Sequence, residues 1–447
     1  MTSDDSLLDA PEGVPVDRPS ASTVRTLVSL SLPSVVVGVV SALVLYAVEA
    51  LVGVLEHAIW STLPGSVGVD PRSGGWIFGV LALTGLAVGL VVWLMPGHGG
   101  QDSATVELTA PPLGLGALPS LVLVAVLGFA GGVSLGPEAP VIAINTALLV
   151  ALVRRVWPAV STELVVMVTA AGTIGALFGT PVAAALVFTG LVGMTKGEGA
   201  LWDRLFLPLL AAAAGALTMS ALGSHGFSIP LPVYDDVSPV DLLSAALVAV
   251  VAAALGLAAA AVFPRLHAWF RLLRNPAVYV TVGGVLLGLL GVIGGPLTLF
   301  KGLNEMGELV DNRAEYGVAA VAVIIVVKVL ALLVSAAAGF RGGRIFPAVF
   351  VGVAIGVLAN GVVPGVPLTV GIGAGVLGMV LAVSRDGWIS LFIAVAVTGS
   401  ITVLPVLCIA VLPAWLLVSR GPEMIVHGPG GHGAPAPRAP ATGGRRS

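Results

Sequence analysis

GGVSLGPEAPVIAI, Gly131 to Ile144, is the stretch of sequence that decides the fold. It lies between apolar runs, yet it carries the carboxylate of Glu138 between Pro137 and Pro140. An acidic side chain at the centre of a membrane helix costs about 2.5 to 3.5 kcal/mol, so it persists where it faces protein or a water-filled path. Glycine and proline break the backbone here, and a helix start exposes N–H groups that bind anions. The stretch therefore predicts an anion site whose place a carboxylate can take.

The composition around this stretch is that of a membrane protein. Of the 447 residues, 57% are hydrophobic and 10% are charged, with a mean hydropathy of +1.07, whereas soluble domains carry about 25% charged residues. The 59 glycines and 31 prolines indicate short, broken and closely packed helices. A net charge of −3 argues against a nucleic-acid partner, and the single cysteine, Cys408, excludes an intrachain disulfide. We expect an all-α polytopic protein of the cell membrane, surrounded by the lipid bilayer, without a cofactor or a metal site.

Polar segments divide the chain into two similar halves. Each half opens with a long span and then breaks before a short helix, at Glu138 and at Pro347. Paired interruptions of this kind point to a midplane ion site between inverted repeats. Residues 96–112 are too polar to span and are interpreted as a re-entrant segment. The predicted organisation is a disordered N-terminal tail at 1–23, a first membrane repeat at 24–222, a linker loop at 223–240, a second membrane repeat at 241–418 and a C-terminal tail at 419–447.

Four segments resemble the CLC family of chloride channels and chloride/proton antiporters. GPEAP, Gly136 to Pro140, resembles the family's GREGP, and GGRIFP, Gly342 to Pro347, resembles its GGIFAP loop. ALFGTPVAAALVF resembles the family segment AAFNAPLAGILF, and GGVLLGLLG resembles the opening of its second half. The resemblance covers roughly residues 24–418. It implies a CLC-type inverted repeat with broken and re-entrant helices, and a homodimer in which each subunit has its own anion pathway.

The resemblance also implies roles for individual residues. Glu138 takes the place of the gating glutamate, which competes with the halide and swings aside when it is protonated or displaced. From the residues alone, the glycine-rich start near Gly342 fits either an anion site or a tight packing turn. Arg341 and Arg344 either sharpen the field at the mouth of the pathway or are boundary charges. The implied anion-binding residues are Gly136, Gly342, Gly343, Arg344, Ile345 and Phe346.

The chain departs from the family at three places. The first anion loop should fall at GGQDSA, Gly99 to Ala104, where Ser103 and Gln101 are the candidate ligands and Asp102 repels an anion unless it points away. The internal acidic residue of proton-coupled members should fall at about Leu191, in a segment without a carboxylate. A tyrosine near the C-terminus is missing, since the last tyrosine is Tyr316.

These departures favour passive, channel-like conduction of chloride or a similar small anion. Strict proton exchange and fluoride selectivity are the alternatives. An intramembrane enzyme would need paired catalytic groups, and His98 with Asp102 is a near pair without a nucleophile elbow, so we expect no enzyme. Lys328 is expected to snorkel to the interface, and Glu49 and Glu56 are expected to face the membrane boundary.

Overall fold

The structure is a computed structural model that describes residues 21–105, 112–194, 200–223 and 227–426. Within these ranges it is almost entirely helical, and nine helical segments are long and apolar enough to cross a membrane. The predicted class, an all-α multi-pass membrane protein, is therefore confirmed. The predicted tails lie mostly outside the described residues, although a helix already begins at Ala21 and the chain is described up to residue 426.

The first half consists of one very long helix followed by shorter ones. Its opening helix continues without interruption from Val24 to Val67, 44 residues, which exceeds the ~20 residues of a perpendicular crossing and requires tilt. The elements are α1 (Ala21–His57), η1 (Ala58–Thr62), α2 (Leu63–Val67), α3 (Gly74–Leu94), η2 (Leu115–Ala117), α4 (Leu118–Ala130), α5 (Glu138–Val156), α6 (Thr162–Phe178), α7 (Pro181–Met194) and α8 (Leu201–Ala221).

The second half also opens with a long helix, α9 (Pro239–Arg271). The first turn of this helix is closed by a capping box between Ser238 and Asp241. The elements are α9 (Pro239–Arg271), α10 (Pro276–Gly294), η3 (Pro296–Thr298), α11 (Leu303–Asp311), η4 (Arg313–Glu315), α12 (Val318–Ala337), α13 (Ile345–Val362), α14 (Leu368–Ser384), α15 (Gly387–Thr398), η5 (Ile401–Val403) and α16 (Leu404–Val418).

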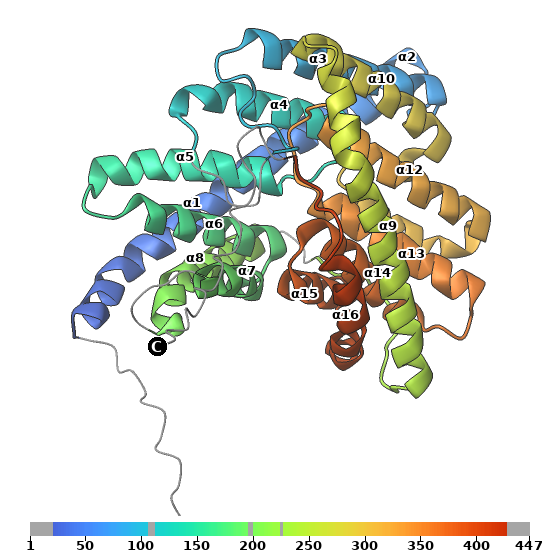
Figure 1. The fold of residues 1–447 in the computed structure, drawn as a ribbon. Helices are drawn as coiled ribbons and strands as arrows, with labels where there is room; N and C mark the ends of the chain where they lie inside the picture. The colour runs from blue at the N-terminus through green and yellow to red at the C-terminus, as the bar shows by residue number, and fades with distance from the viewer. Residues whose placement is uncertain (1–20, 106–111, 195–199, 224–226, 427–447) are drawn as a thin grey trace, which may run out of the picture.

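The two halves are interlocked rather than merely adjacent. In Figure 1, α5 to α8 lie on one side of the molecule and α12 to α16 on the other, while α3 of the first half packs along α10 of the second. Glycines allow this approach: a Cβ placed on Gly85 would lie 2.7 Å from the Cα of Gly284. Small residues let membrane helices pack with their backbones close together, so the α3–α10 pair fixes one half against the other.

Extended segments from both halves meet at the centre of the fold. Gly136 and Gly343 form an antiparallel bridge, with N–H···O distances of 2.8 and 2.7 Å. This bridge is the one β-type pairing in the described chain, and α5 and α13 begin directly after it (Figure 1). Of the predicted re-entrant segment, residues 96–105 form turns that bury Ser103 and Ala104, and 106–111 lie outside the described residues. The central bridge thus brings two helix starts to one place.

Candidate functional site

Glu138 is the first residue of α5 and is almost completely buried, with 2% of its surface exposed. Pro137 occupies the N-cap position, so the helix starts without a capping side chain of its own. The Oε1 atom of Glu138 accepts a hydrogen bond from the backbone N–H of Ile345 at 2.9 Å. Its Oε2 atom is buried and accepts no hydrogen bond from any described residue. The carboxylate of the first half therefore occupies the helix start of the second half.

The backbone around Glu138 leaves no space for a further side chain. A Cβ on Gly343 would lie 2.0 Å from the Cδ atom of Glu138, and a Cβ on Gly136 would lie 2.0 Å from its Oε2 atom. Glycine is thus required at both ends of the bridge for the carboxylate to fit. The N–H groups of Gly136 and Gly343 are already donated to each other's carbonyls, so among the predicted anion-binding amides these two are engaged in structure.

The structure places the two candidate ligands of the first loop differently. Ser103 is buried, and its Oγ atom accepts a hydrogen bond from the N–H of Gly342 at 2.9 Å. Gln101 is exposed on the same turn. Ser103 is therefore the residue that the fold brings to the glycine loop of the second half.

The Asp102 carboxylate lies in a half-buried ionic cluster with His267, Arg271 and Arg341. Its Oδ2 atom accepts a hydrogen bond from Arg271 and lies 3.1 Å from the Nε2 atom of His267, and its Oδ1 atom lies 3.7 Å from Arg341. Burial by itself would raise the pKa of Asp102, but the His267 hydrogen bond and the charges of Arg341 and Arg271 outweigh it and lower the pKa to about 2. The carboxylate thus stays ionised, and the charges of Arg271 and Arg341 balance it.

Arg341 is part of this cluster rather than of a pathway mouth. It is buried, and its guanidinium donates to the carbonyls of Gly99 at 2.9 Å, His98 at 3.1 Å and Gly339 at 2.9 Å. These bonds tie the loop that carries Ser103 to the segment that precedes α13. Of the two alternatives predicted for Arg341, a charge at the mouth and a boundary charge, neither describes this position.

Lys328 does not snorkel, and that expectation was wrong. Its side chain is completely buried, and its ammonium group donates to the carbonyls of Thr298, Leu299 and Phe300 at 3.2, 2.7 and 2.9 Å. It also lies 4.9 Å from the ring centroid of Phe350. The ammonium group satisfies a turn of backbone that ends beside Lys301, so it is a structural cation.

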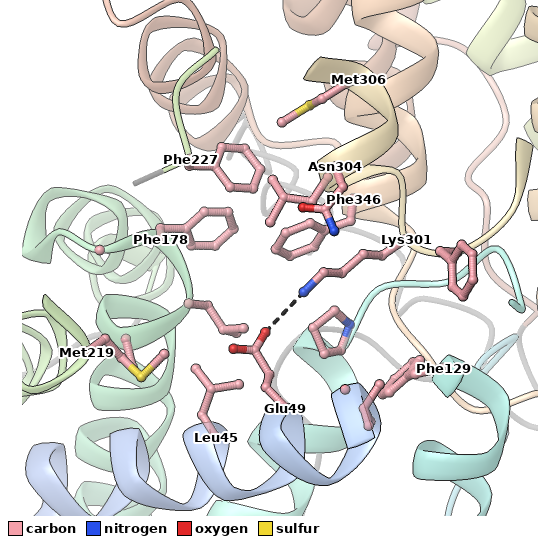
Figure 2. A pocket seen from close by; sticks show the side chains of 18 of the residues that line it. Leu45, Glu49, Phe129, Phe178, Met219, Phe227, Lys301, Asn304, Met306 and Phe346 are labelled. Atoms are coloured by element: carbon pink, nitrogen blue, oxygen red, sulfur yellow. Dashed lines mark hydrogen bonds and ion pairs between the residues drawn. The ribbon is translucent and has the colours of Figure 1, made fainter. Parts of the chain in front are cut away.

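Two cavities meet at Glu138. The first, of about 750 Å³, is called the Lys301 cavity here; it is lined by Pro137 and Phe346 and by the charged residues Glu49, Glu56, Lys301 and Glu305 (Figure 2). The second, of about 1030 Å³, is called the Ser103 cavity; it is lined by Glu138 itself and by Ser103, Ile345, Cys408, Asp386 and Glu423. Adjacent residues thus belong to opposite cavities, Pro137 and Phe346 to one and Glu138 and Ile345 to the other. The bonded pair of Glu138 and Ile345, called the barrier below, thus lines one cavity and is directly followed or preceded in the chain by residues of the other.

Aromatic rings cover the Lys301 side of this barrier. Phe178 stacks on Phe346 with 6.0 Å between ring centroids, and Phe227 meets Phe346 edge-on at 5.2 Å. Figure 2 shows the three rings together, with the Lys301 ammonium group directed toward Glu49 beside them. The ring of Phe346 therefore forms part of the wall on which an anion would arrive.

The charged lining of the Lys301 cavity was not predicted from the sequence. Glu49 and Glu56 were expected at the membrane boundary, but both line the cavity, and Glu49 Oε1 accepts from Lys301 Nζ at 3.0 Å. A signal was present, because residues seven apart lie two turns apart on one face of a helix. The near pair of His98 and Asp102 serves the fold instead, since His98 Nδ1 lies 2.8 Å from the carbonyl of Val92.

Comparisons with known proteins agree with this architecture. The chain is 49% identical over 405 residues to the "Putative ion-transport protein YfeO" of Escherichia coli (strain K12 / DH10B) and equally to that of Shigella boydii serotype 4 (strain Sb227); each alignment covers 91% of this chain and 96% of the relative.

Solved structures share the fold at low sequence identity. The crystal structure of a CLC-type fluoride/proton antiporter superimposes with a TM-score of 0.68 at 19% identity, covering 91% of this chain and 98% of that one. A slow cyanobacterial Cl⁻/H⁺ antiporter gives a TM-score of 0.71 at 17% identity, covering 88% and 94%. The family model "Voltage gated chloride channel" matches residues 83–419. The chain therefore belongs to the voltage-gated chloride channel family, whose members are ion-transport proteins and not enzymes.

Proposed function

We propose that the chain moves a small monovalent anion, chloride in the first place, along a path that Glu138 closes. One observation carries the proposal: a buried carboxylate oxygen of Glu138 lies 2.9 Å from the N–H of Ile345, at the barrier between two cavities. A helix start with exposed N–H groups is an anion site. The carboxylate occupies this site, and an anion takes its place when the carboxylate is protonated or displaced.

The path can be followed residue by residue. An anion that enters the Lys301 cavity passes the ring of Phe346 and reaches the start of α13, where the amides of Ile345 and Phe346 and the dipole of the helix replace part of its water. Ser103 lies beyond the start of α13, where it is bonded to Gly342. Because the Gly136 and Gly343 amides bond to each other, they hold the walls and do not ligate the ion.

The mode of transport has two candidates. Passive conduction is the first, because the short helix α7 offers no carboxylate near Leu191 for proton transfer. Proton-coupled exchange is the second, and one observation favours it: Asp386 and Glu423 line the Ser103 cavity together with Glu138. A carboxylate that lines the same cavity as the gate can exchange protons with it through water.

Anion efflux from liposomes tests both candidates. The purified protein is reconstituted with chloride inside, a chloride electrode and a pH electrode are placed outside, and Glu138→Ala is measured in parallel. Chloride efflux without uphill proton movement supports passive conduction. Uphill proton movement that Glu138→Ala and Glu423→Gln both abolish supports the coupled form. Absence of chloride efflux from both proteins, followed by fluoride efflux from the wild type, would replace chloride by fluoride as the substrate.

Dimeric assembly is part of the same proposal. Family membership supports a homodimer in which each subunit keeps a complete path, because Glu138, Ile345 and both cavities all belong to one chain. Mass photometry of the protein in detergent measures the assembly. A monomeric protein with full transport activity would overturn it.

A further inference from the structure

More negative than positive side chains line the Lys301 cavity. Among the described residues that line it, three carboxylates, Glu49, Glu56 and Glu305, face a single cation, Lys301. The Nζ atom of Lys301 lies 5.9 Å from the ring centroid of Phe346, the residue that follows Ile345 at the start of α13. An anion on its way to Glu138 therefore meets this ammonium group next to the barrier.

The backbone that carries Lys301 is held rigidly. The Lys328 ammonium group binds the three carbonyls at 298–300, and the N–H of Phe300 donates to the carbonyl of Gly132 at 3.0 Å. The ring of Phe300 packs edge-on against Trp60, with 5.4 Å between centroids. The ammonium group of Lys301 is thus presented from a fixed turn, as a binding residue must be.

The Glu49 carboxylate is bonded to the Lys301 ammonium group, just as the Glu138 carboxylate is bonded to the backbone N–H of Ile345. Its Oε1 atom lies 3.0 Å from Lys301 Nζ, and Figure 2 shows the two side chains meeting across the cavity. About a third of each side chain is exposed, 29% for Lys301 and 35% for Glu49, so water and ions reach the pair. An ion pair of this exposure is weak, so a dissolved anion can compete with the carboxylate.

The other charges around the pair set the cost of bringing in an anion. Glu56 comes from the same opening helix, Glu305 from α11, and the ammonium of Lys328 stands behind the turn. Burial raises the pKa of Glu305, although the charge of Lys328 opposes this effect. Glu49 is the carboxylate bonded to Lys301, so it is the one that an arriving anion has to displace.

We propose that Lys301 is an anion-binding residue of an entry site, where a small monovalent anion displaces the Glu49 carboxylate from the ammonium group before it reaches Glu138. The inference rests on the proposed transport function and adds a second binding site to it. The path then holds two carboxylates in series, Glu49 and Glu138. Each accepts a hydrogen bond from a donor to which the anion has to bind. Lys301 concentrates the anion at the barrier, and Glu49 prevents it from being held too tightly.

The test is the dependence of chloride efflux on chloride concentration in liposomes. Lys301→Met should raise the half-saturating concentration about tenfold, the lower end of what a focused charge contributes, with a smaller change in maximal rate. Lys301→Arg, which keeps the charge, should stay near the wild type. Glu49→Gln, which keeps the cation and removes its competitor, should lower the half-saturating concentration. Arg313→Gln is the matched control, because Arg313 follows α11 and lies outside the cavity lining.

The outcomes separate this inference from the proposed function. A wild type without anion efflux, or one indifferent to Glu138→Ala, would remove the proposed function itself. A wild type with saturable efflux whose half-saturating concentration is unchanged in both Lys301→Met and Glu49→Gln would overturn the entry site alone. If Lys301→Met does not fold, as judged by size-exclusion chromatography, Glu49→Gln decides: a lowered half-saturating concentration supports the site and an unchanged one overturns it.

Discussion

Glu138 and Ile345 stand 207 positions apart in the chain, yet the carboxylate of one accepts a 2.9 Å hydrogen bond from the backbone of the other. Each half of the molecule contributes one partner, and each partner is the first residue of its helix. The bond therefore joins the two halves at the point where both backbones are broken. In the proposed function this bond also closes the path, so replacing Glu138 should alter transport.

Gly343→Ala should open the proposed path while Glu138 itself is not replaced. The new Cβ would lie 2.0 Å from Glu138 Cδ and 2.1 Å from Oε1. The carboxylate therefore has to move away and give up its hydrogen bond with the N–H of Ile345. Hydrogen bonds to charged groups contribute about 1.5 to 3 kcal/mol, so we expect chloride efflux to rise about tenfold or more. The double variant with Glu138→Ala should be no faster than Glu138→Ala alone. Gly114→Ala is the control, since its Cβ meets nothing within 4 Å. A folded Gly343→Ala protein with wild-type efflux would contradict the prediction.

Ser103→Ala should destabilise the protein, whereas Gln101→Ala should not. Removing the Ser103 hydroxyl leaves the buried N–H of Gly342 without its 2.9 Å acceptor, and an unsatisfied buried donor costs about 1 to 3 kcal/mol. Gln101 is exposed, and such substitutions change stability by about 0.5 kcal/mol or less. Thermal unfolding in detergent compares the two variants. Equal midpoints for both would show that Ser103 does not support the glycine loop.

Much of this site could be predicted because its signals are local. A carboxylate between prolines within apolar sequence marks Glu138, and the paired glycines mark the second loop; both are visible in a few consecutive residues. Lengths of apolar sequence likewise indicate the spans. These features depend on the chemistry of the membrane interior and not on knowledge of which segments meet.

The contacts between distant segments could not be predicted in the same way. The charge of Asp102 is balanced by Arg271, which lies 169 positions later in the chain. Lys328 is structural because the carbonyls at 298–300 fold over it. A charged residue inside a span can snorkel, pair or bind backbone, and its sequence neighbours are the same in all three cases. For Lys328, the packing of α10, α12 and the turn between them decides which of the three occurs.

Asp102 should make stability depend on acid pH. Its folded pKa of about 2 lies below the ordinary 3.8, so the ionised carboxylate stabilises the fold above about pH 4. This contribution, roughly 2 kcal/mol, is lost as the pH falls from about 4 toward 2. Asp102→Asn should therefore unfold more easily at neutral pH and lose this part of the acid dependence, which unfolding midpoints measured from about pH 7 to pH 2 would show. Asp70→Asn, on an exposed loop, is the control, and an unchanged acid dependence in Asp102→Asn would contradict the assignment.

Cys408 offers a direct probe of the Ser103 cavity. It is the single cysteine of the chain, it is exposed, and it lines the Ser103 cavity together with Glu138. An anionic methanethiosulfonate reagent attached there places a negative charge beside the path, and like charges at close range cost about 1 kcal/mol even in water, so chloride efflux should fall about fivefold. A cationic reagent of the same size should slow efflux less, because it attracts the ion while it narrows the cavity. Cys408→Ser should be insensitive to both reagents, which separates modification of this thiol from damage to the membrane. Labelled protein, verified by mass spectrometry, whose efflux is unaffected by either charge would mean that anions do not pass through this cavity, and the path would then have to leave Glu138 by another side.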